Sequence, residues 1–388
     1  MMIKLFKYIN TIDLIPTLFF LIAAIIWRTS YYVWGLYAMI PIIIMYSWLK
    51  CGRHIRASVY WKPYLLLVIW MWLSSAFSAD SAYSFKLMIP VTATFLLSFS
   101  ILVCSERGNN SQMFALAFIS LFISIMYATL TGDSYISNFD YANESERRAN
   151  TEMNSNQYAY FSLFAIMATR LVLGSKVVNR PILRIMLYLF LVAVVIFTAL
   201  LTASRQIFVL ELPVILFFIY YDFWRNGSVK LRGLLLVVFI VVVVIIVPKV
   251  LFFYENSYLA IRASGGIQED TRSSLIMIGF QQGLENPFWG LGLGADTFFS
   301  HCTYTHLFAR CGFPALILFL YIVINPIKEQ YYRFKITRDS YYLLYMFLLI
   351  VFSIANFFYS YIEQPFMMTV LFLIVGESNK RFYKPVIV

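Results

Sequence analysis

The sequence has few charged residues. Asp, Glu, Lys and Arg make up only 13% of its 388 residues, whereas a soluble domain carries roughly 25%. Hydrophobic residues make up 61% of the chain, and its mean hydropathy is +0.76. The apolar residues come in runs of about 17–21, which are long enough to cross ~30 Å of hydrocarbon. This composition excludes a soluble globular protein.

Histidine and cysteine are also scarce, with three His and four Cys. No C-x-x-C, H-E-x-x-H or clustered carboxylate pattern occurs, so the sequence predicts no metal site. Cys302 and Cys311 fall on one expected helix, about 13 Å apart by helical rise. That separation is too long for a disulfide, and we expect free thiols. The net charge of +11 is explained by basic inner loops of a membrane protein, so we expect no nucleic-acid partner.

The apolar runs predict an all-α integral membrane protein of about twelve transmembrane helices. We interpret residues 1–388 as a single polytopic membrane domain. The expected spans are 11–27, 31–49, 63–77, 87–104, 113–131, 157–174, 184–201, 207–222, 233–252, 307–325, 341–357 and 362–376. Most Lys and Arg residues fall in alternate connecting segments, which predicts that both termini lie on the inner, cytoplasmic side.

The basic residues expected on the outer side are mostly arginine. Ten of the twelve lysines are expected inside, and the outer residues are Arg28, Lys86, Arg147, Arg148, Arg205, Lys249, Arg262, Arg272 and Arg310. Arg is the better bidentate partner for phosphate and carboxylate oxygens. The enrichment favours an anionic ligand on that side, with a chance distribution as the alternative.

Two outer loops are long. The loop 132–156 is polar and of mixed charge. The loop 253–306 contains SSLIMIGFQQGL, which predicts an amphipathic helix, followed by a Gly-rich turn region. Asp270 or Thr271 is the expected N-cap of this helix, and we expect its apolar residues Leu275, Ile276, Ile278 and Phe280 to lie along one side.

Two of the four candidate site segments carry a single arginine each. In TASRQ, Arg205 begins a hydrophobic helix, and a charge near membrane depth is a functional candidate; the alternative is an arginine that snorkels to the interface. Glu211 lies six residues further on, either as a neutral acid or as the partner of a base. In 268–294, Arg272 falls in the first turn of the predicted helix, whose N-terminus also favours a phosphate.

The other two segments carry histidines and asparagines. His301 and His306 lie at the outer entrance of the span at 307–325. A histidine there can stay neutral and accept a proton from a hydroxyl, and nearby positive charge lowers its pKa. In 147–161, Arg147 and Arg148 precede Asn154 and Asn156, whose amides can bind sugar hydroxyls; a polar helix cap is the alternative interpretation.

At these segments the chain resembles the O-antigen ligase/polymerase family of bacterial envelope glycosyltransferases. The resemblance covers about 147–320, and before that it extends only to the pattern of spans. The matching pieces are MNSNQYAY, Ser204-Arg205 with Gln206 where Gly is usual, Arg272 followed by Asn286-Pro287 and Gly290 to Gly294, and His301 with Tyr304 and Gly312. Cys302 replaces the Asn that usually follows the histidine.

The resemblance implies a metal-independent enzyme without a cofactor, in the bacterial inner membrane, with its active site facing the periplasm. Its donor is a glycan on undecaprenyl pyrophosphate in the outer leaflet, and its acceptor is a saccharide hydroxyl. Arg205 and Arg272 would stabilise the pyrophosphate, and His301 would orient or deprotonate the acceptor. The expected substrate-binding residues are Arg147, Arg148, Asn154, Asn156, Arg310 and His306. Membrane lipids and other envelope polysaccharide assembly proteins are the further expected partners.

Three functions remain open from the sequence. We favour an O-antigen polymerase, whose acceptor is the sugar of another lipid-linked repeat unit. The alternative is an O-antigen ligase, whose acceptor is the lipid A core. A transporter or flippase of lipid-linked sugars is the third, although such proteins usually carry several ionisable residues at mid-membrane depth, where this sequence places only Glu211.

Overall fold

The computed structural model describes residues 60–107, 271–294, 302–358 and 365–383, and between these it describes 162–170 with gaps, 181–202, 210–225 and scattered positions from 228 to 255. The chain divides into two compact units. The first comprises Met1–Val33 and Ala115–Glu269, and the second comprises Trp34–Phe114 and Asp270–Val388. Each unit is described by itself below. Every regular element among the described residues is helical, which confirms the all-α class.

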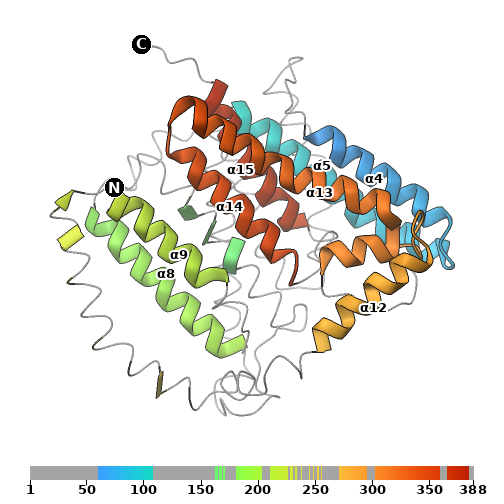
Figure 1. The fold of residues 1–388 in the computed structure, drawn as a ribbon, viewed down its shortest axis with the longest axis horizontal. Helices are drawn as coiled ribbons and strands as arrows, with labels where there is room; N and C mark the ends of the chain where they lie inside the picture. The colour runs from blue at the N-terminus through green and yellow to red at the C-terminus, as the bar shows by residue number, and fades with distance from the viewer. Residues whose placement is uncertain are drawn as a thin grey trace. The chain divides into compact units, whose positions relative to one another are not determined.

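The second unit contains most of the described residues (Figure 1). Its helices are α4 (Trp61–Ala76), α5 (Ser81–Arg107), α12 (Thr271–Glu285), α13 (Thr303–Thr337), α14 (Tyr341–Ala355) and α15 (Pro365–Tyr383). Four of them match the spans expected at 63–77, 87–104, 341–357 and 362–376. The span expected at 307–325 is the central part of α13, and α12 is the predicted amphipathic helix.

The helices of this unit run between two ends that hydrogen bonds define. We call one of them the loop end, because it contains the loop Asn286–Gly294. There Ser74 of α4 donates to the Trp289 carbonyl oxygen at 2.6 Å, and the Gly294 N–H donates to Ser84 of α5 at 2.8 Å. We call the other the network end, because the polar cluster around Arg333 lies there. There the Tyr60 hydroxyl donates to the Glu329 carboxylate of α13. Helix α4 therefore runs towards the loop end, and α5 runs back from it.

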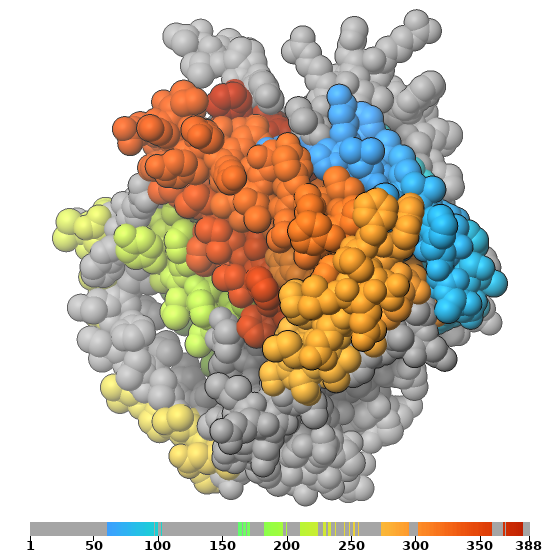
Figure 2. All heavy atoms as spheres, turned by 45° about the vertical axis from the view of Figure 1, so that its right-hand side comes forward, coloured from blue at the N-terminus to red at the C-terminus, as the bar shows by residue number. Residues whose placement is uncertain are grey.

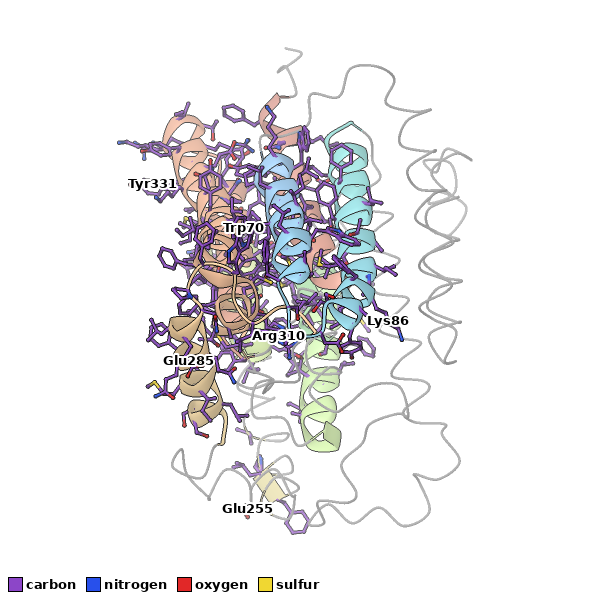
Figure 3. All side chains as sticks on the ribbon, turned by 90° about the vertical axis from the view of Figure 1, so that its right-hand side faces the viewer. Trp70, Lys86, Glu255, Glu285, Arg310 and Tyr331 are labelled. Atoms are coloured by element: carbon purple, nitrogen blue, oxygen red, sulfur yellow. The ribbon has the colours of Figure 1, made fainter. Side chains whose placement is uncertain are left out.

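Helices α13, α14 and α15 extend the same alternation. The Thr303 N–H at the start of α13 donates to the carbonyl oxygen of Asn356, which follows α14, at 2.8 Å. Arg333, near the other end of α13, donates to Ser378 of α15 at 2.7 Å. Figure 3 shows Arg310 and Tyr331 towards opposite ends of α13, with Lys86 at the level of Arg310. Helices α5, α13 and α15 thus end at the network end, and α14 returns to the loop end.

Large apolar side chains remain exposed along these helices. They include Leu66, Ile69 and Leu73 of α4, with Phe77 at its C-cap, and Phe313, Ile317, Tyr321 and Ile324 of α13. These positions recur every three or four residues, so they form a stripe on one side of each helix. Soluble proteins rarely expose continuous apolar stripes, which mark membrane or protein contacts. Among the described residues, α13 is the one helix that is both long and apolar enough to cross a membrane.

The first unit contains α8 (Pro181–Thr202), α9 (Leu212–Ile219) and the π-helix η3 (Tyr220–Arg225). A buried ion pair joins Arg170 to Asp222 at 2.7 Å. The Tyr188 hydroxyl donates to the other oxygen of Asp222, and the Arg170 guanidinium lies 5.5 Å from the centroid of the Tyr221 ring. A buried charge pair needs such additional partners to offset its desolvation.

The segment expected as a span at 184–201 is helical, and the described positions within 157–174, 207–222 and 233–252 are helical as well. The spans expected at 11–27, 31–49 and 113–131 lie outside the described residues, as does the loop 132–156. The count of about twelve spans and the single-domain organisation stay predictions.

Candidate functional site

Helix α13 is broken near its start. Gly312 has φ 76° and ψ −179°, a combination that is essentially restricted to glycine. Pro314 follows two residues later, has no N–H to donate, and its ring clashes with a helical carbonyl four residues earlier, here that of Arg310. We call residues 309–314 the α13 break. Two helical donors are lost here, because the Phe313 N–H donates to the Pro287 carbonyl oxygen and Pro314 has no N–H.

The carbonyl groups of the α13 break accept hydrogen bonds from other segments. The N–H groups of Leu291 and Gly292 donate to Ala309 and Arg310 at 2.9 and 2.8 Å, and the Trp70 indole N–H donates to Cys311 at 2.8 Å. A buried acceptor without a donor would cost about 1–3 kcal/mol. The break is therefore compatible with burial because the loop and α4 complete its hydrogen bonding.

The loop Asn286–Gly294 is shaped to fit this break. The Phe313 N–H donates to the Pro287 carbonyl oxygen at 2.7 Å. Gly292 has φ 93°, and a Cβ atom there would lie 2.1 Å from the Ser78 side chain. The glycines of this loop thus allow the tight turn that the sequence predicted. In the structure they lie against residues of α5 and α13 and the turn that follows α4.

Aromatic rings close one side of this loop. Trp289 stacks on Trp70 with a centroid distance of 4.7 Å and an interplanar angle of 2°. Its ring also lies 4.3 Å from that of Phe77, and Phe288 meets Trp70 edge-on at 5.2 Å. Such pairs each add about 0.5–1.5 kcal/mol beyond area burial. The segment Asn286–Gly294 is therefore a rigid part of the fold.

Helix α12 packs on α13 through glycine. Gly279 and Gly283 are its buried positions, and a Cβ atom on Gly283 would lie 2.3 Å from the Phe308 ring. The helix contacts α13 through these glycines, whereas Ile278 and Phe280 are 39% and 45% exposed. The Gly-x-x-x-Gly spacing, a signature of close helix approach, is the signal that would have identified the packed side.

Arg310 is held at the loop end. Its guanidinium donates to the Leu293 carbonyl oxygen, and the side chain is half-buried. The sequence assigned Arg310 to phosphate binding. The structure gives its side chain a second role, because this hydrogen bond ties the loop to the α13 break.

His306 is buried, at 2% exposure, within the first part of α13. The start of this helix is fixed to the end of α14, since the Tyr304 hydroxyl donates to the Ser353 carbonyl oxygen at 2.9 Å. Cys302 and Cys311 are both buried, and both are free thiols, which confirms the prediction for this pair. No group of three or more metal-ligating side chains occurs within the described part of the chain.

Several candidate residues lie outside the described residues, namely Arg147, Arg148, Asn154, Asn156, Arg205 and His301. Arg272 is in the first turn of α12, and its side chain is also outside them. The structure therefore brings together two of the four sequence segments, the Asn286–Gly294 loop and the Gly312 region, and their roles in catalysis stay predictions.

Glu211 is a buried acid in the first unit, with 1% exposure. The hydroxyl of Ser162, also fully buried, donates to its Oε2 at 2.6 Å. Among the described residues, Oε1 has no hydrogen-bond donor. The sequence left two interpretations of Glu211 open, a neutral acid and the partner of a basic residue. No basic partner of Glu211 is found among the described residues, and the Ser162 hydroxyl donates to one of the Glu211 oxygens.

A second polar cluster, missed by the sequence reasoning, lies at the network end. Arg333 is 3% exposed and donates to Glu329, Ser378 and Asn379. Its guanidinium also lies 4.9 Å from the centroid of the Phe382 ring. The spacing of Glu329 and Arg333, four residues apart on one helix, is the sequence signal for this pair. The cluster joins α13 to α15.

A neighbouring pair at the same end is more exposed. Arg381 donates from Nε to Asp339 at 2.6 Å, with side chains 41% and 28% exposed. Partial burial alone would lower the pKa of Arg381, but the hydrogen bond and the charge of Asp339 outweigh it, so the pKa is raised. This guanidinium therefore stays charged at every accessible pH.

Comparison with known proteins identifies no relative: the sequence matches no protein-family model, and no curated protein is significantly similar to it.

Proposed function

We propose that this protein is a membrane glycosyltransferase, specifically a surface-polysaccharide (O-antigen) polymerase. It transfers a glycan from undecaprenyl pyrophosphate to the acceptor sugar of another lipid-linked repeat unit at the periplasmic face of the inner membrane. The observation that carries the proposal is the joining of two motif segments. The Asn286–Gly294 loop and the Gly312 region are separate in the sequence, and the Phe313–Pro287 and Gly292–Arg310 hydrogen bonds make them one structural element.

This element supports the family resemblance because one of the matching residues, Gly312, is needed for its shape. Gly312 adopts a glycine-only conformation, and a Cβ atom there would lie 2.1 Å from the Phe288 carbonyl oxygen. Pro287 supplies the carbonyl that receives the Phe313 N–H. Gly312 is thus a structural requirement of this element, which joins the end of α12 to the first part of α13. Arg272 lies in the first turn of α12, and His301 directly precedes the N-cap residue of α13 in the sequence.

The charge distribution supports the proposed topology. Among the described residues of the second unit, the basic residues towards the loop end are Lys86, Arg272 and Arg310. Those towards the network end are Lys62, Arg107, Lys328, Arg333, Lys335, Arg338, Lys380 and Arg381. Basic residues concentrate on the cytoplasmic side of membrane proteins. The loop end is accordingly periplasmic in the proposal, with both chain termini cytoplasmic and about twelve spans between them.

The proposed chemistry follows from the leaving group. The acceptor hydroxyl oxygen attacks the anomeric carbon, the bond from that carbon to the phosphate oxygen breaks, and undecaprenyl pyrophosphate leaves with inversion. His301 takes the hydroxyl proton. Arg205 and Arg272 stabilise the negative charge that grows on the pyrophosphate. The acceptor arrives on a second lipid-linked unit, and Asn154 and Asn156 contact sugar hydroxyls.

The deciding experiment is the surface-glycan ladder of a deletion strain. Loss of a polymerase leaves a single repeat unit on lipid A. A naked core, with long glycan accumulating on undecaprenyl pyrophosphate in the periplasmic leaflet, would indicate a ligase instead. Accumulation of single lipid-linked units in the cytoplasmic leaflet would indicate a flippase, and an unchanged ladder would refute all three.

A further inference from the structure

An apolar hollow of about 410 Å³ lies between α12 and the α13 break. Its lining consists entirely of hydrocarbon side chains, four of them phenylalanines: Phe280, Leu284, Pro287, Phe288, Phe308, Phe313 and Leu316. The volume has room for about a dozen carbon-sized groups, if each takes the ~30 Å³ of a water molecule in the liquid. With such walls the hollow cannot offer water the polar partners that it needs.

The hollow opens to the surface. Leu284, Phe313 and Phe280 are 57%, 53% and 45% exposed, and α12 lies uncovered on the face shown in Figure 2. Large exposed apolar side chains around an apolar hollow mark a contact with lipid or another hydrophobic ligand.

The walls of the hollow are fixed to one another by the fold. On one side, the Phe308 ring lies directly against Gly283, so α12 and α13 are in close contact there. On the other side, the Phe313–Pro287 hydrogen bond of 2.7 Å fixes the far wall to the loop. The hollow therefore exists before any ligand enters, and binding does not require it to be opened.

We propose that this hollow holds the isoprenoid units nearest the pyrophosphate of the lipid-linked donor. The inference rests on the proposed function and locates the lipid part of its substrate. Arg272 is in the first turn of α12, and Phe280 is eight residues later, or about 12 Å along the helix axis. One short helix thus presents a cation and a dipole-positive N-terminus at its start, and a hydrocarbon hollow towards its end. That order matches an amphiphile with an anionic head and a hydrocarbon chain.

The first experiment fills the hollow. Leu284→Trp places an indole at its exposed wall, and Ile324→Trp is the matched control, a half-exposed apolar position on α13 outside the lining. With the purified full-length protein, we expect Leu284→Trp to raise KM for the undecaprenyl-linked donor about tenfold, the effect of losing roughly two methylene contacts. KM for a donor whose pyrophosphate carries a methyl group in place of the isoprenoid chain should change much less, and kcat for both donors should be unchanged.

The reason for this difference is that the methyl donor has no isoprenoid units to place in the hollow. An equal rise in KM for both donors would overturn the proposal, because it would indicate a general disturbance of the site. An equal rise in the Ile324→Trp control would overturn it as well.

The second experiment locates the bound lipid pyrophosphate in the absence of turnover. An undecaprenyl pyrophosphate analogue with a photoreactive group on its second isoprene unit is irradiated with the wild-type protein in nanodiscs, and the labelled peptides are sequenced. We expect labels on 280–288 and 308–316, lost in Leu284→Trp. Labels on other peptides would overturn the proposal. So would labels that an excess of phospholipid removes as effectively as an excess of unlabelled undecaprenyl pyrophosphate. If the proposed function alone is wrong, the wild type makes no polymer and these labels remain.

Discussion

The indole N–H of Trp70 donates to the carbonyl oxygen of Cys311 at 2.8 Å. This bond joins α4 to the α13 break at the carbonyl group directly before Gly312. Because the Trp70 ring also stacks on Trp289, a single side chain connects α4, the Asn286–Gly294 loop and α13. The loop end is therefore organised around backbone groups of a broken helix.

Two adjacent serines of α4 provide a test of this organisation. Both are buried, but the Ser74 hydroxyl lies within hydrogen-bonding distance of the Trp289 and Arg310 carbonyl oxygens, at 2.6 and 3.2 Å, whereas Ser75 donates to Met71 within its own helix. Ser74→Ala should lower the free energy of unfolding by about 1–3 kcal/mol, because it leaves buried acceptors short of a donor. Ser75→Ala should cost less than about 0.5 kcal/mol, because Met71 keeps its helical partner. Denaturation in detergent micelles measures both, and equal losses would contradict the special role of Ser74.

Gly312 provides the second test. Gly312→Ala combines a conformational cost of about 1–3 kcal/mol with a Cβ atom 2.1 Å from the Phe288 carbonyl oxygen. We expect a loss of more than about 3 kcal/mol in unfolding free energy, or failure to fold. The control is Gly233→Ala, at a helical position where a Cβ atom meets nothing within 4 Å, and it should be neutral or stabilising by up to ~1 kcal/mol. Thermal denaturation of the detergent-purified variants decides between these outcomes, and a neutral Gly312→Ala would refute the steric argument.

Arg333 and Arg381 differ in burial, and their replacement should differ in cost. Arg333→Met removes the donor to Glu329, Ser378 and Asn379, and breaking a buried network typically costs about 3–5 kcal/mol. Arg381→Met breaks a pair that is 41% and 28% exposed, which costs about 1 kcal/mol or less. Unfolding midpoints in the same detergent test the order, and a larger loss in Arg381→Met would reverse our assignment.

Substitutions of Arg205 and Arg272 test whether these arginines stabilise the leaving pyrophosphate. If each grips pyrophosphate oxygens with a guanidinium fork, Lys cannot fully replace Arg at either position, because it loses the bidentate geometry. Loss of a transition-state contact of ~3–4 kcal/mol should slow turnover roughly 10²–10³-fold. The measurement is kcat with a lipid-linked donor at matched protein levels. Wild-type turnover in both Arg→Ala variants would dismiss the role.

The pH dependence of the rate tests whether His301 is the general base. A general base contributes roughly 10²–10⁴ in rate and acts only while neutral. The wild-type rate should therefore fall as the pH drops through the pKa of the imidazole, whose ordinary value is about 6.5. His301→Gln should be nearly inactive and lose this titration, while His306→Ala should be milder. A pH–rate profile of His301→Gln that keeps both the rate and the titration would make His301 a positioning residue for the acceptor.

The sequence predicted the helices well because long apolar runs have few alternatives in a chain with so little charge. The amphipathic helix at 271–285 was predicted from its cap residues and followed by a Gly-rich turn, as the structure has it. Its packed side was not predicted: hydropathy draws attention to Ile278 and Phe280, whereas the residue in close contact with Phe308 is Gly283. Hydropathy reports which residues avoid water, and in a membrane protein that does not identify which of them contact protein.

The connections of the loop end were beyond sequence reasoning for a different reason. Trp70 and Ser74 belong to an ordinary apolar span, and nothing in their local pattern indicates a bond to residues more than 200 positions away. The Gly312 and Pro314 pair does signal a helix break, but the donors that complete it come from elsewhere in the chain. The catalytic assignments of Arg205, Arg272 and His301 rest on the resemblance and stay predictions.

The pairing of α5 with α15 has a consequence for how the chain is made. Helix α5 packs more extensively against α15 than against its neighbour α4, yet 257 residues separate Arg107 from Pro365. At a synthesis rate of ~5–20 residues per second, α5 waits roughly 13–50 s for this partner. During that interval its buried serines and threonine must be shielded by lipid, by the insertion machinery or by a chaperone. Assembly of this unit is thus completed only near the end of translation, and truncation before α15 should expose the nascent protein to quality-control proteases.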